Sequence, residues 1–307
     1  MLTADILIPA YRPDERFEKL LKRLDAQCCP IRRVIVMNTE KAFFPKEIAE
    51  QYGRVEVHHV TKSEFDHGGT RDRGIRLSDA DVVVCMTQDA VPKDRHLIEN
   101  LMKAFEDPEV WAAYARQLPA EGCSEVEAYT RSFNYPPESR RKGKEDLPAM
   151  GIKAFFCSNV CAAWRRDRYL ELGGFEKRTI FNEDMILAGK LLQAGGRIAY
   201  CADARVIHSH NYSAMQQFHR YFDLAVSQTM HPEVFAGVRS ESEGVRLVKK
   251  CAGHCIRVGK PWLVFSVVTQ NAGKFLGYRL GKRYKKLPRK LILKCTMNRS
   301  FWQEEGR

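Results

Sequence analysis

The stretch Asp81-Val-Val-Val-Cys-Met-Thr-Gln-Asp89 ends an apolar run at a carboxylate, and Ala90-Val91-Pro92 follows it. The apolar run predicts a buried strand, and the proline bars that strand from continuing. Asp89 is therefore expected at the carboxyl end of a strand, where open α/β sheets bind their ligands. A lone carboxylate there is typical of a hard-cation ligand facing phosphate oxygens, and it is also typical of a strand-ending turn.

The segments before this strand alternate between the period of strands and the period of helices. The predicted strands are 5–9, 33–37, 55–60 and 81–86, and the predicted helices are 15–27, 45–52 and 70–77, the last opening after Gly68-Gly69. Strands that alternate with helices predict a parallel sheet with right-handed crossovers. The fold class is therefore α/β, and the first ninety residues resemble a nucleotide-binding half.

The pattern becomes irregular after a predicted helix at 95–105 and a predicted strand at 110–114. Residues 131–147 contain a proline pair and the run Arg140-Arg141-Lys142-Gly143-Lys144, which predict a long mobile loop. This loop is either a solvated charge run or a lid over an anionic donor. Further on, a helix is predicted at 183–194, followed by short strands at 197–200 and 205–207.

Composition describes a globular chain with an uneven charge. The 307 residues are 44% hydrophobic, which is enough for a large domain and an appendage. The ten cysteines lie scattered without CxxC spacing, so we expect free thiols in a reducing compartment and no zinc site. The first residues carry no signal-peptide pattern, and the longest apolar stretch near the C-terminus, 262–268, is too short to span a membrane. We expect a soluble or peripheral protein.

The basic excess is confined to the last part of the chain. From Arg239 onward there are 17 of the 50 Lys and Arg residues but only 4 of the 38 Asp and Glu residues. Residues 245–256 and 260–289 mix these cations with aromatic and aliphatic residues, which is typical of an interfacial amphipathic helix on anionic lipid. We expect an α/β domain in residues 1–235 and a basic amphipathic extension in residues 236–307 that meets a membrane surface.

Two alternatives remain for the basic extension. Nucleic acid would also attract the charge, but no helix-turn-helix, zinc finger or RNA-binding signature accompanies it, so we expect no nucleic-acid partner. A solvated charged face is the other alternative.

Six segments, taken together in their order, carry a family resemblance. They are Ile8-Pro9-Ala10-Tyr11, Gly68-Gly69-Thr70-Arg71-Asp72-Arg73-Gly74, Gln88-Asp89, Gly173-Gly174-Phe175, Asn182-Glu183-Asp184 and Val206-Ile207-His208. The set resembles the GT-A family 2 glycosyltransferases, and within them the rhamnosyltransferase branch, over about residues 4–212. The resemblance implies a GT-A fold, a mostly parallel central sheet flanked by helices, with a helical basic C-terminal extension.

The resemblance also implies a nucleoside diphosphate sugar donor. Its base would lie near the ends of the first two strands, at Pro9, Tyr11 and Asn38. The family usually has an acid where Asn38 stands, but an amide can still hydrogen-bond the imide edge of uracil or thymine. Gln88 is a further residue expected at the donor.

The diphosphate is expected at the glycine pair. Gly68 and Gly69 precede a predicted helix, whose first N–H groups can approach a phosphate, and Arg71 adds a charged donor. An ordinary turn is the competing interpretation of two adjacent glycines.

A divalent ion, Mg²⁺ or Mn²⁺, is expected at Asp89 and His208. The family commonly has two acids in an Asp-x-Asp arrangement, whereas Thr87 stands at the first place here. One carboxylate suffices, because the ion takes most of its ligands from diphosphate and water. His208 matches the family position that closes this site, although a strand-end histidine is also typical of a structural role. His210, two residues on, is expected to point to the opposite face, which disfavours a metal-dependent hydrolase.

Asp184 is expected to carry catalysis. In the family, the aspartate of a Glu-Asp pair at a helix start takes the proton of the attacking hydroxyl, with inversion at the anomeric carbon. Glu183 would orient the acceptor or the loop. The alternative is that Asn182, Glu183 and Asp184 only cap the helix and complement its dipole. Among nearby aromatic residues, Trp164 is expected to be partly exposed.

The resulting hypothesis is a metal-dependent, inverting glycosyltransferase. We expect transfer of L-rhamnose from dTDP-rhamnose to a growing cell-surface glycan on a membrane lipid, at the cytoplasmic face of the cell membrane. A UDP-hexose or UDP-N-acetylhexosamine donor is the alternative within the class. A silent nucleotide-sugar or glycan-binding module is the alternative outside it, because Thr87 and Asn38 depart from the family's acids.

Overall fold

The computed structural model describes residues 2–238 and 242–304. Within them one sheet has the strand order β3-β2-β1-β4-β8-β6-β9-β5, with β7 paired to β9. The strands are β1 (Ala4–Tyr11), β2 (Val34–Thr39), β3 (Val55–Val60), β4 (Val82–Met86), β5 (Val91–Pro92), β6 (Val110–Leu118), β7 (Arg140–Lys142), β8 (Cys161–Arg165) and β9 (Arg197–Ile207).

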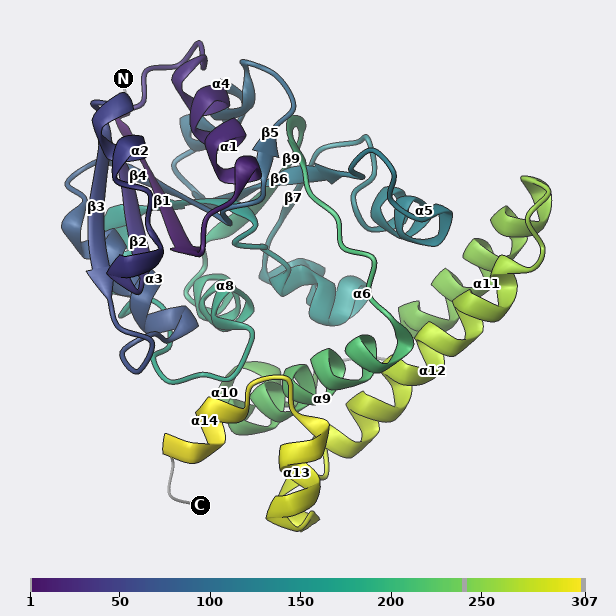
Figure 1. Cartoon of the computed structure of the whole chain (residues 1–307). Coiled ribbons are helices and arrows are strands. Elements are labelled where there is room, and N and C mark those ends of the chain that lie inside the picture. The colour runs from purple at the N-terminus through teal and green to yellow at the C-terminus, as the bar shows by residue number, and fades with distance from the viewer. Residues whose placement is uncertain (1, 239–241, 305–307) are drawn as a thin grey trace.

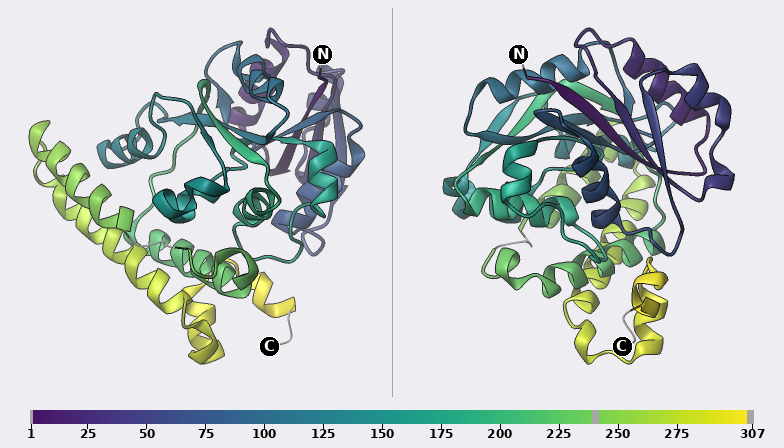
Figure 2. Two further views of the ribbon diagram at one scale, coloured as in Figure 1. Left: turned by 180° about the vertical axis from the view of Figure 1, so that it is seen from behind. Right: turned by 90° about the vertical axis from the view of Figure 1, so that its left-hand side faces the viewer.

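Helices cover both faces of this sheet (Figures 1 and 2). Those before the C-terminal arm are α1 (Glu15–Asp25), α2 (Lys46–Gln51), α3 (His67–Leu77), α4 (Leu97–Met102), α5 (Glu125–Asn134), α6 (Leu147–Met150), α7 (Arg166–Glu171), α8 (Glu183–Gln193), α9 (Ala214–Met230) and α10 (Pro232–Phe235). Short 3-10 turns are η1 (Lys41–Phe43), η2 (Lys103–Glu106), η3 (Lys144–Asp146), η4 (Gly151–Phe155) and η5 (Tyr284–Lys286).

The parallel part of the sheet is formed by the strands predicted first. β1 pairs in parallel with β2 and β4, and β2 pairs in parallel with β3, so the carboxyl ends of these strands share one edge. β8 runs antiparallel between β4 and β6, and β6 pairs in parallel with β9. The α/β class and the mostly parallel sheet are confirmed. The two short strands predicted at 197–200 and 205–207 are one strand, β9, with an irregularity in its pairing to β6.

Alternate residues of β1 enter two separate cores, one on each face of the sheet. Ile6 and Ile8 pack with Phe17 of α1 in the first core, whereas Leu7 packs with Ile75 of α3 in the second. Because both faces are covered, the strands read as continuous apolar runs.

The expectation of a mobile loop at 131–147 is wrong. Its first residues belong to α5, and β7 pairs antiparallel with β9. Lys142, inside the basic run, is only 1% exposed. Its ammonium group donates to the carbonyl oxygens of Phe156 and Lys153, at 2.6 and 3.3 Å. These acceptors allow a lysine to be buried where composition alone indicated a solvated segment.

The C-terminal helices form an arm and a return. The arm is a hairpin of α11 (Ser242–Arg257) and α12 (Leu263–Gly281), and the return is α13 (Arg289–Cys295) and α14 (Arg299–Glu304) (Figures 1 and 2). α12 packs along α9 through Gly273, Gly277 and Gly281, where any Cβ would collide with a backbone carbonyl oxygen of α9. No helix within residues 2–238 and 242–304 is long and apolar enough to cross a membrane.

Candidate active site

The expected metal ligands converge after the ends of β4 and β9. Asp89 follows β4, and His208 is the first residue after β9. His208 Nε2 lies 3.6 Å from one carboxylate oxygen of Asp89, and His210 Nε2 lies 3.4 Å from the other. One ligand atom from each of the three residues lies within 4.8 Å of the others. A carboxylate with two imidazoles is a donor set that fits Mn²⁺.

The expectation that His210 points to the opposite face is wrong. Side chains two residues apart in an extended strand point to the same face, so the spacing of His208 and His210 favours their convergence, and β9 ends just before them, at Ile207. The chain then turns, with the N–H of Tyr212 donating to the carbonyl oxygen of His210 at 3.1 Å. This turn brings the two imidazole Nε2 atoms to 3.0 Å from each other.

A hydrogen bond orients the His208 ring. Its Nδ1 lies 3.1 Å from Oε1 of Gln117, a buried residue of β6. Arg131 also donates to that oxygen, so the oxygen is an acceptor and Nδ1 carries the proton. Burial lowers the pKa of His208 to about 3, although Asp89 opposes this shift. A neutral ring with a free Nε2 lone pair is the form that binds a metal ion.

The expected catalytic pair, Glu183 and Asp184, lies at the first turn of α8. Asp184 is partly exposed and accepts hydrogen bonds from the backbone N–H groups of Asn159 and Met185, at 3.1 and 2.8 Å. Burial and the charge of Glu183 raise the pKa of Asp184 to about 7. A carboxylate with this pKa matches a general base that works near neutral pH.

Glu183 stays charged beside it. Its Oε1 lies 3.1 Å from Nη1 of Arg71 and accepts from Nδ2 of Asn159 at 3.3 Å. Burial alone would raise the pKa of Glu183, but Arg71, His67 and Asn159 together hold it below its usual value. The two adjacent acids therefore differ in protonation, as an acid and base pair at one site does.

The alternative that Asn182 caps α8 through its side chain is not supported by the structure. Asn182 is the N-cap residue but has a left-handed backbone, φ 66°, and makes no capping hydrogen bond. Its side-chain amide instead donates to the carbonyl oxygen of Leu224 on α9, at 3.3 Å.

Sequence patterns did not identify Asn159, which touches both acids. Its Oδ1 accepts a hydrogen bond from Trp164 Nε1 at 3.0 Å. Trp164 is 1% exposed, so the expectation of partial exposure is wrong. The indole fixes the side-chain amide, which donates to Glu183, while the backbone N–H of the same residue donates to Asp184.

The loop that carries Asn159 also reaches Asp89, His208 and His210, here called the metal group because they are the candidate metal ligands. Ser158 Oγ lies 3.4 Å from Nε2 of Gln117, the residue that orients His208. The N–H of Thr87, two residues before Asp89, donates to the carbonyl oxygen of Val160 at 3.1 Å. One short loop therefore contacts both the segment that carries Asp89 and the helix that carries Asp184. Lys142 anchors the start of this loop by its hydrogen bond to the carbonyl oxygen of Phe156.

The residues expected at the base lie together at the ends of β1 and β2. Asn38 is fully buried and lies opposite Ala10, next to Pro9. Its Nδ2 contacts Nδ1 of His59 at 3.0 Å, whereas its Oδ1 has no partner among the described residues. Tyr11 is 40% exposed and packs edge-on against Phe43, with ring centroids 5.8 Å apart.

Gln88 links the end of β1 to the segment that carries Asp89. Its Oε1 accepts from the N–H of Tyr11 at 2.8 Å, and its Nε2 donates to the carbonyl oxygen of Tyr11 at 3.1 Å. Both ends of the amide are therefore engaged with the backbone that would bind the base.

The glycine pair lies inside the first turn of α3, not before the helix. Asp66 caps this helix and accepts from the N–H of Gly69 at 2.6 Å. Gly68 has room for no side chain, because a Cβ would collide with the carbonyl oxygen of Glu176. Arg71, 7% exposed, pairs with Glu183. The structure thus brings these residues to Glu183, and their contact with phosphate stays a prediction.

Arg220 is a second residue that sequence patterns did not identify. It lies on α9, with its guanidinium carbon 4.7 Å from the ring centroid of Phe181 and 5.7 Å from that of Tyr212. Its charge contributes to lowering the pKa of both His208 and His210, after the larger effect of burial. Within residues 2–238 and 242–304 it forms no ion pair, which leaves the cation available to an anionic ligand.

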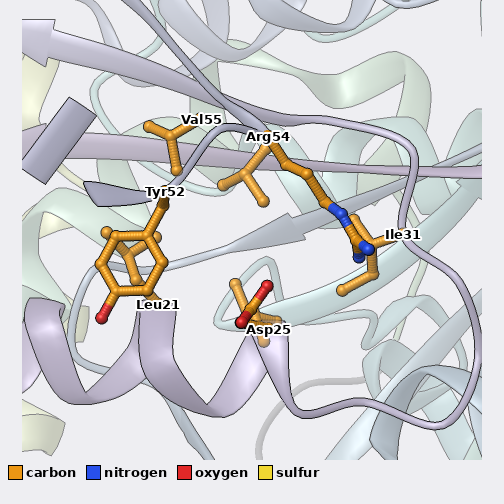
Figure 3. A pocket seen from close by; sticks show the side chains of 8 residues that line it. Leu21, Asp25, Ile31, Tyr52, Arg54 and Val55 are labelled. Atoms are coloured by element: carbon orange, nitrogen blue, oxygen red, sulfur yellow. The ribbon is translucent and has the colours of Figure 1, made fainter. Parts of the chain in front are cut away.

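A separate small pocket lies at the amino ends of β2 and β3. Figure 3 shows the side chains that line it. The residues that line it are Leu21, Leu24, Asp25, Ile31, Val34, Tyr52, Arg54 and Val55. Val34 and Val55 begin β2 and β3, whereas Asn38 lies near the end of β2. The pocket is therefore distinct from the cluster that contains Asp89 and Asp184.

Solved structures share this fold. A mannosyltransferase from Pyrobaculum calidifontis, solved in complex with GDP-Man and Mn²⁺, aligns with a TM-score of 0.64 at 14% identity, over 93% of this chain and 88% of that one. TarS from S. aureus, residues 1–349, aligns with a TM-score of 0.54 at 13% identity, over 93% and 91%. These likenesses show the GT-A fold.

Curated relatives match nearly the whole chain. The O-antigen chain rhamnosyltransferase RfbN of Salmonella typhimurium is 36% identical over 301 residues, 97% of this chain and 95% of the relative. The O-antigen chain rhamnosyltransferase WbaN of Salmonella anatum is 35% identical over 302 residues, with the same coverage. The profile of the family described as glycosyl transferase family 2 matches residues 5–173. The chain belongs to glycosyl transferase family 2 and is a glycosyltransferase of the GT-A fold.

Proposed function

We propose that this protein transfers L-rhamnose from dTDP-rhamnose, with inversion, to a hydroxyl of a lipid-linked cell-surface glycan. The observation that carries the proposal is the position of the Asp184 carboxyl, which accepts from the N–H groups of Asn159 and Met185 at the start of α8, where burial and Glu183 raise its pKa. This carboxyl is joined through the loop of Ser158 and Asn159 to the group of Asp89, His208 and His210. The names of the relatives RfbN and WbaN support the choice of sugar and of O-antigen as acceptor.

In the proposed reaction, Asp184 takes the proton of the acceptor hydroxyl as that oxygen attacks the anomeric carbon. The new bond forms between this oxygen and the carbon, while the bond from the carbon to the diphosphate oxygen breaks. The electron pair of that bond leaves with dTDP. Glu183, ionised and held by Arg71, keeps the proton affinity of Asp184 high, because a second negative charge nearby disfavours ionisation.

Asp89, His208 and His210 would hold Mn²⁺ or Mg²⁺. When bound, such an ion neutralises charge on the departing diphosphate. Among the protein's own groups, Arg220 would add a second positive charge there, since it lies by the same histidines.

At the other end of the donor, the buried Oδ1 of Asn38 would accept the imide N–H of thymine, while Tyr11 and Phe43 would contact the base. Gln88 would act by holding the backbone of Tyr11, and Pro9 by ending this strand beside Asn38. Gly68 and Gly69 would allow α3 to approach the diphosphate together with Arg71.

For the whole chain, we propose a catalytic unit in residues 1–235 and an extension in residues 236–307. The enzyme would work at the cytoplasmic face of the cell membrane, as a peripheral protein, because its acceptor is carried by a lipid. α10 ends at Phe235, at the proposed boundary.

A donor panel tests the proposal. Purified protein with Mn²⁺ would be incubated with dTDP-rhamnose, UDP-glucose, UDP-N-acetylglucosamine or GDP-mannose, and release of nucleoside diphosphate would be measured with and without a lipid-linked rhamnose-accepting glycan. We expect acceptor-dependent release from dTDP-rhamnose. Release from a UDP-sugar alone would replace the proposed donor, and binding without release from any donor would indicate a silent module.

A further inference from the structure

The outer face of α12 carries an apolar surface that the rest of the described chain leaves open. Phe265, Val268, Phe275 and Leu276, here called the α12 stripe, are 51–78% exposed. Their spacing places them on one side of the helix, over about 17 Å of its length. Trp262, 68% exposed, continues the surface towards the hairpin turn. A contiguous row of large exposed apolar side chains marks a contact surface for another body.

The inner face of α12 fixes the direction in which the α12 stripe points. Gly273, Gly277 and Gly281 lie against carbonyl oxygens of α9, so the two helix backbones touch. Towards the hairpin turn, Val267 is buried in a small core with Val126 of α5. The rest of the chain lies along one side of the arm (Figures 1 and 2). Because α12 is held against that side through its glycines and Val267, the exposed α12 stripe lies on the opposite side.

The charge carried by most of the arm and return has a single sign, and Glu125 of α5 pairs with Lys260 at the hairpin turn. Residues 244–303 contain 15 Lys and Arg residues and no Asp or Glu. Arg279 shares the outer face of α12 and lies 5.2 Å from the ring centroid of Phe275. Exposed Arg257 lies at the hairpin turn. The apolar row is therefore bordered by cations at both ends.

These two properties together select one kind of partner. The same surface of a second copy would bring the cations of one arm against those of the other, with no acid within residues 244–303 of either copy to pair with them, which opposes this association. A nucleic acid would meet the charge but would leave the phenylalanine rings in water. A bilayer with anionic headgroups buries the rings among acyl chains and pairs the cations with phosphate.

We propose that the α12 stripe and Trp262 form the surface by which the protein docks on an anionic phospholipid bilayer, with α12 lying along the interface. α9, which carries Arg220 at the candidate site, packs directly on the inner face of α12. Docking thus holds the site at a constant height above the lipid. The inference about docking needs no sugar transfer, and only this last consequence depends on the proposed function.

Vesicle binding by the full chain tests the surface. The probes are vesicles of phosphatidylglycerol with phosphatidylethanolamine, and vesicles of phosphatidylcholine alone. We expect cosedimentation with the anionic vesicles, weakened by salt, and little with phosphatidylcholine. Trp262 is far more exposed than Trp164 and Trp302, at 1% and 5%. Binding should therefore shift tryptophan emission to the blue, and Trp262→Phe should remove most of the shift while binding persists.

A matched pair of variants distinguishes binding through the α12 stripe from non-specific binding through any exposed apolar side chain. Phe265→Ser combined with Phe275→Ser should lower partition into anionic vesicles at least about tenfold, since two rings no longer enter the interface. Leu77→Ser removes an exposed apolar side chain from α3 and should change nothing. Unchanged thermal unfolding of both variants would establish that they fold.

Three results would overturn the inference. One is equal binding of the double variant and the wild type to anionic vesicles. Another is a wild type that binds neither kind of vesicle. The third is a wild-type dimer in sedimentation velocity that becomes a monomer in the double variant without vesicle binding, because the stripe would then be a contact between copies. None of these assays uses donor or acceptor, so a failure here is distinct from failure of the proposed transfer.

Discussion

The backbone N–H of Asn159 donates to the carboxylate of Asp184 at 3.1 Å. The side chain of Asn159 reaches the neighbouring Glu183, so one residue fixes the separation of two acids whose pKa values are shifted in opposite directions. The tuning of Asp184 therefore depends on a local geometry that single substitutions can alter predictably.

The first prediction concerns the pH dependence of transfer. Asp184 must be deprotonated to accept a proton, so kcat/KM should rise with pH and level off above about 7. Glu183→Gln removes the negative charge that helps raise this pKa, so the rising limb should move to lower pH, by roughly one unit. A profile measured with saturating Mn²⁺ checks this, and a limb that moves to higher pH would contradict the assignment.

The second prediction concerns stability. In the unfolded chain the Asp184 carboxyl has a pKa of about 3.9, whereas burial and Glu183 raise it to about 7 in the folded protein. Because the folded state holds its proton longer, this residue lowers stability as pH rises through that window. The stability of Asp184→Asn relative to wild type should therefore increase by about 2 kcal/mol between roughly pH 5 and pH 8. Urea unfolding measures this, with exposed Asp203→Asn as the control that should show no such trend.

The third prediction tests the corrected position of His210. His210 Nε2 lies 3.4 Å from Asp89 and 3.0 Å from His208 Nε2, so we expect it to bind the ion with them. His210→Ala should weaken Mn²⁺ binding at least about tenfold, as measured by titration calorimetry. His96→Ala, whose ring pairs with Glu99 on the surface, is the control. Unchanged affinity in His210→Ala would remove this residue from the metal group.

The fourth prediction concerns buried Lys142. Its ammonium group holds the carbonyl oxygens of Phe156 and Lys153, at the start of the loop that positions Asn159. Lys142→Met keeps the volume but frees the loop, so kcat should fall at least about tenfold, while the affinity for Mn²⁺ stays unchanged. Kinetics and metal titration on the same preparation check this. Equal loss of both would indicate general misfolding instead of a displaced loop.

The fifth prediction compares two glycines of the arm. Gly277 touches the backbone of Phe218, so Gly277→Ala should destabilise the protein by about 1–3 kcal/mol. Gly253 lies in α11 with nothing near its missing side chain, so Gly253→Ala should stabilise it by up to about 1 kcal/mol. Thermal unfolding decides the signs. Two substitutions with the same effect would show that α12 is not held against α9 in this way.

Much of the fold could be predicted because its signals are local. Phe17, Leu20, Leu21 and Leu24 recur at helical spacing within the predicted helix at 15–27, and all four are buried in α1. β8 was not predicted, because its antiparallel place between β4 and β6 depends on partners distant in sequence. Lys142 was expected in a mobile loop because its acceptors belong to another segment, and nothing local reveals them.

The candidate site could be predicted where its residues follow strands, and not where they lie in loops or helices without a sequence pattern. Asp89 and His208 each follow a strand, and strands of one sheet bring such ends together. Asn159 in a loop and Arg220 on a helix lie in no recognisable pattern, and only tertiary packing gives them their neighbours. His210 lies on the same side as His208, as two residues at an i, i+2 spacing do in an extended chain, so its expected opposite placement did not follow from the spacing.

The central claim is that Asp184 takes the proton of the acceptor hydroxyl while Asp89 serves the metal ion. The most direct test is the transfer rate of Asp184→Asn at saturating dTDP-rhamnose, on protein that binds donor and Mn²⁺ as the wild type does. The account predicts that this rate falls by about 10²–10⁴-fold. A rate within about twofold of wild type, far inside the expected loss from a missing general base, would contradict it.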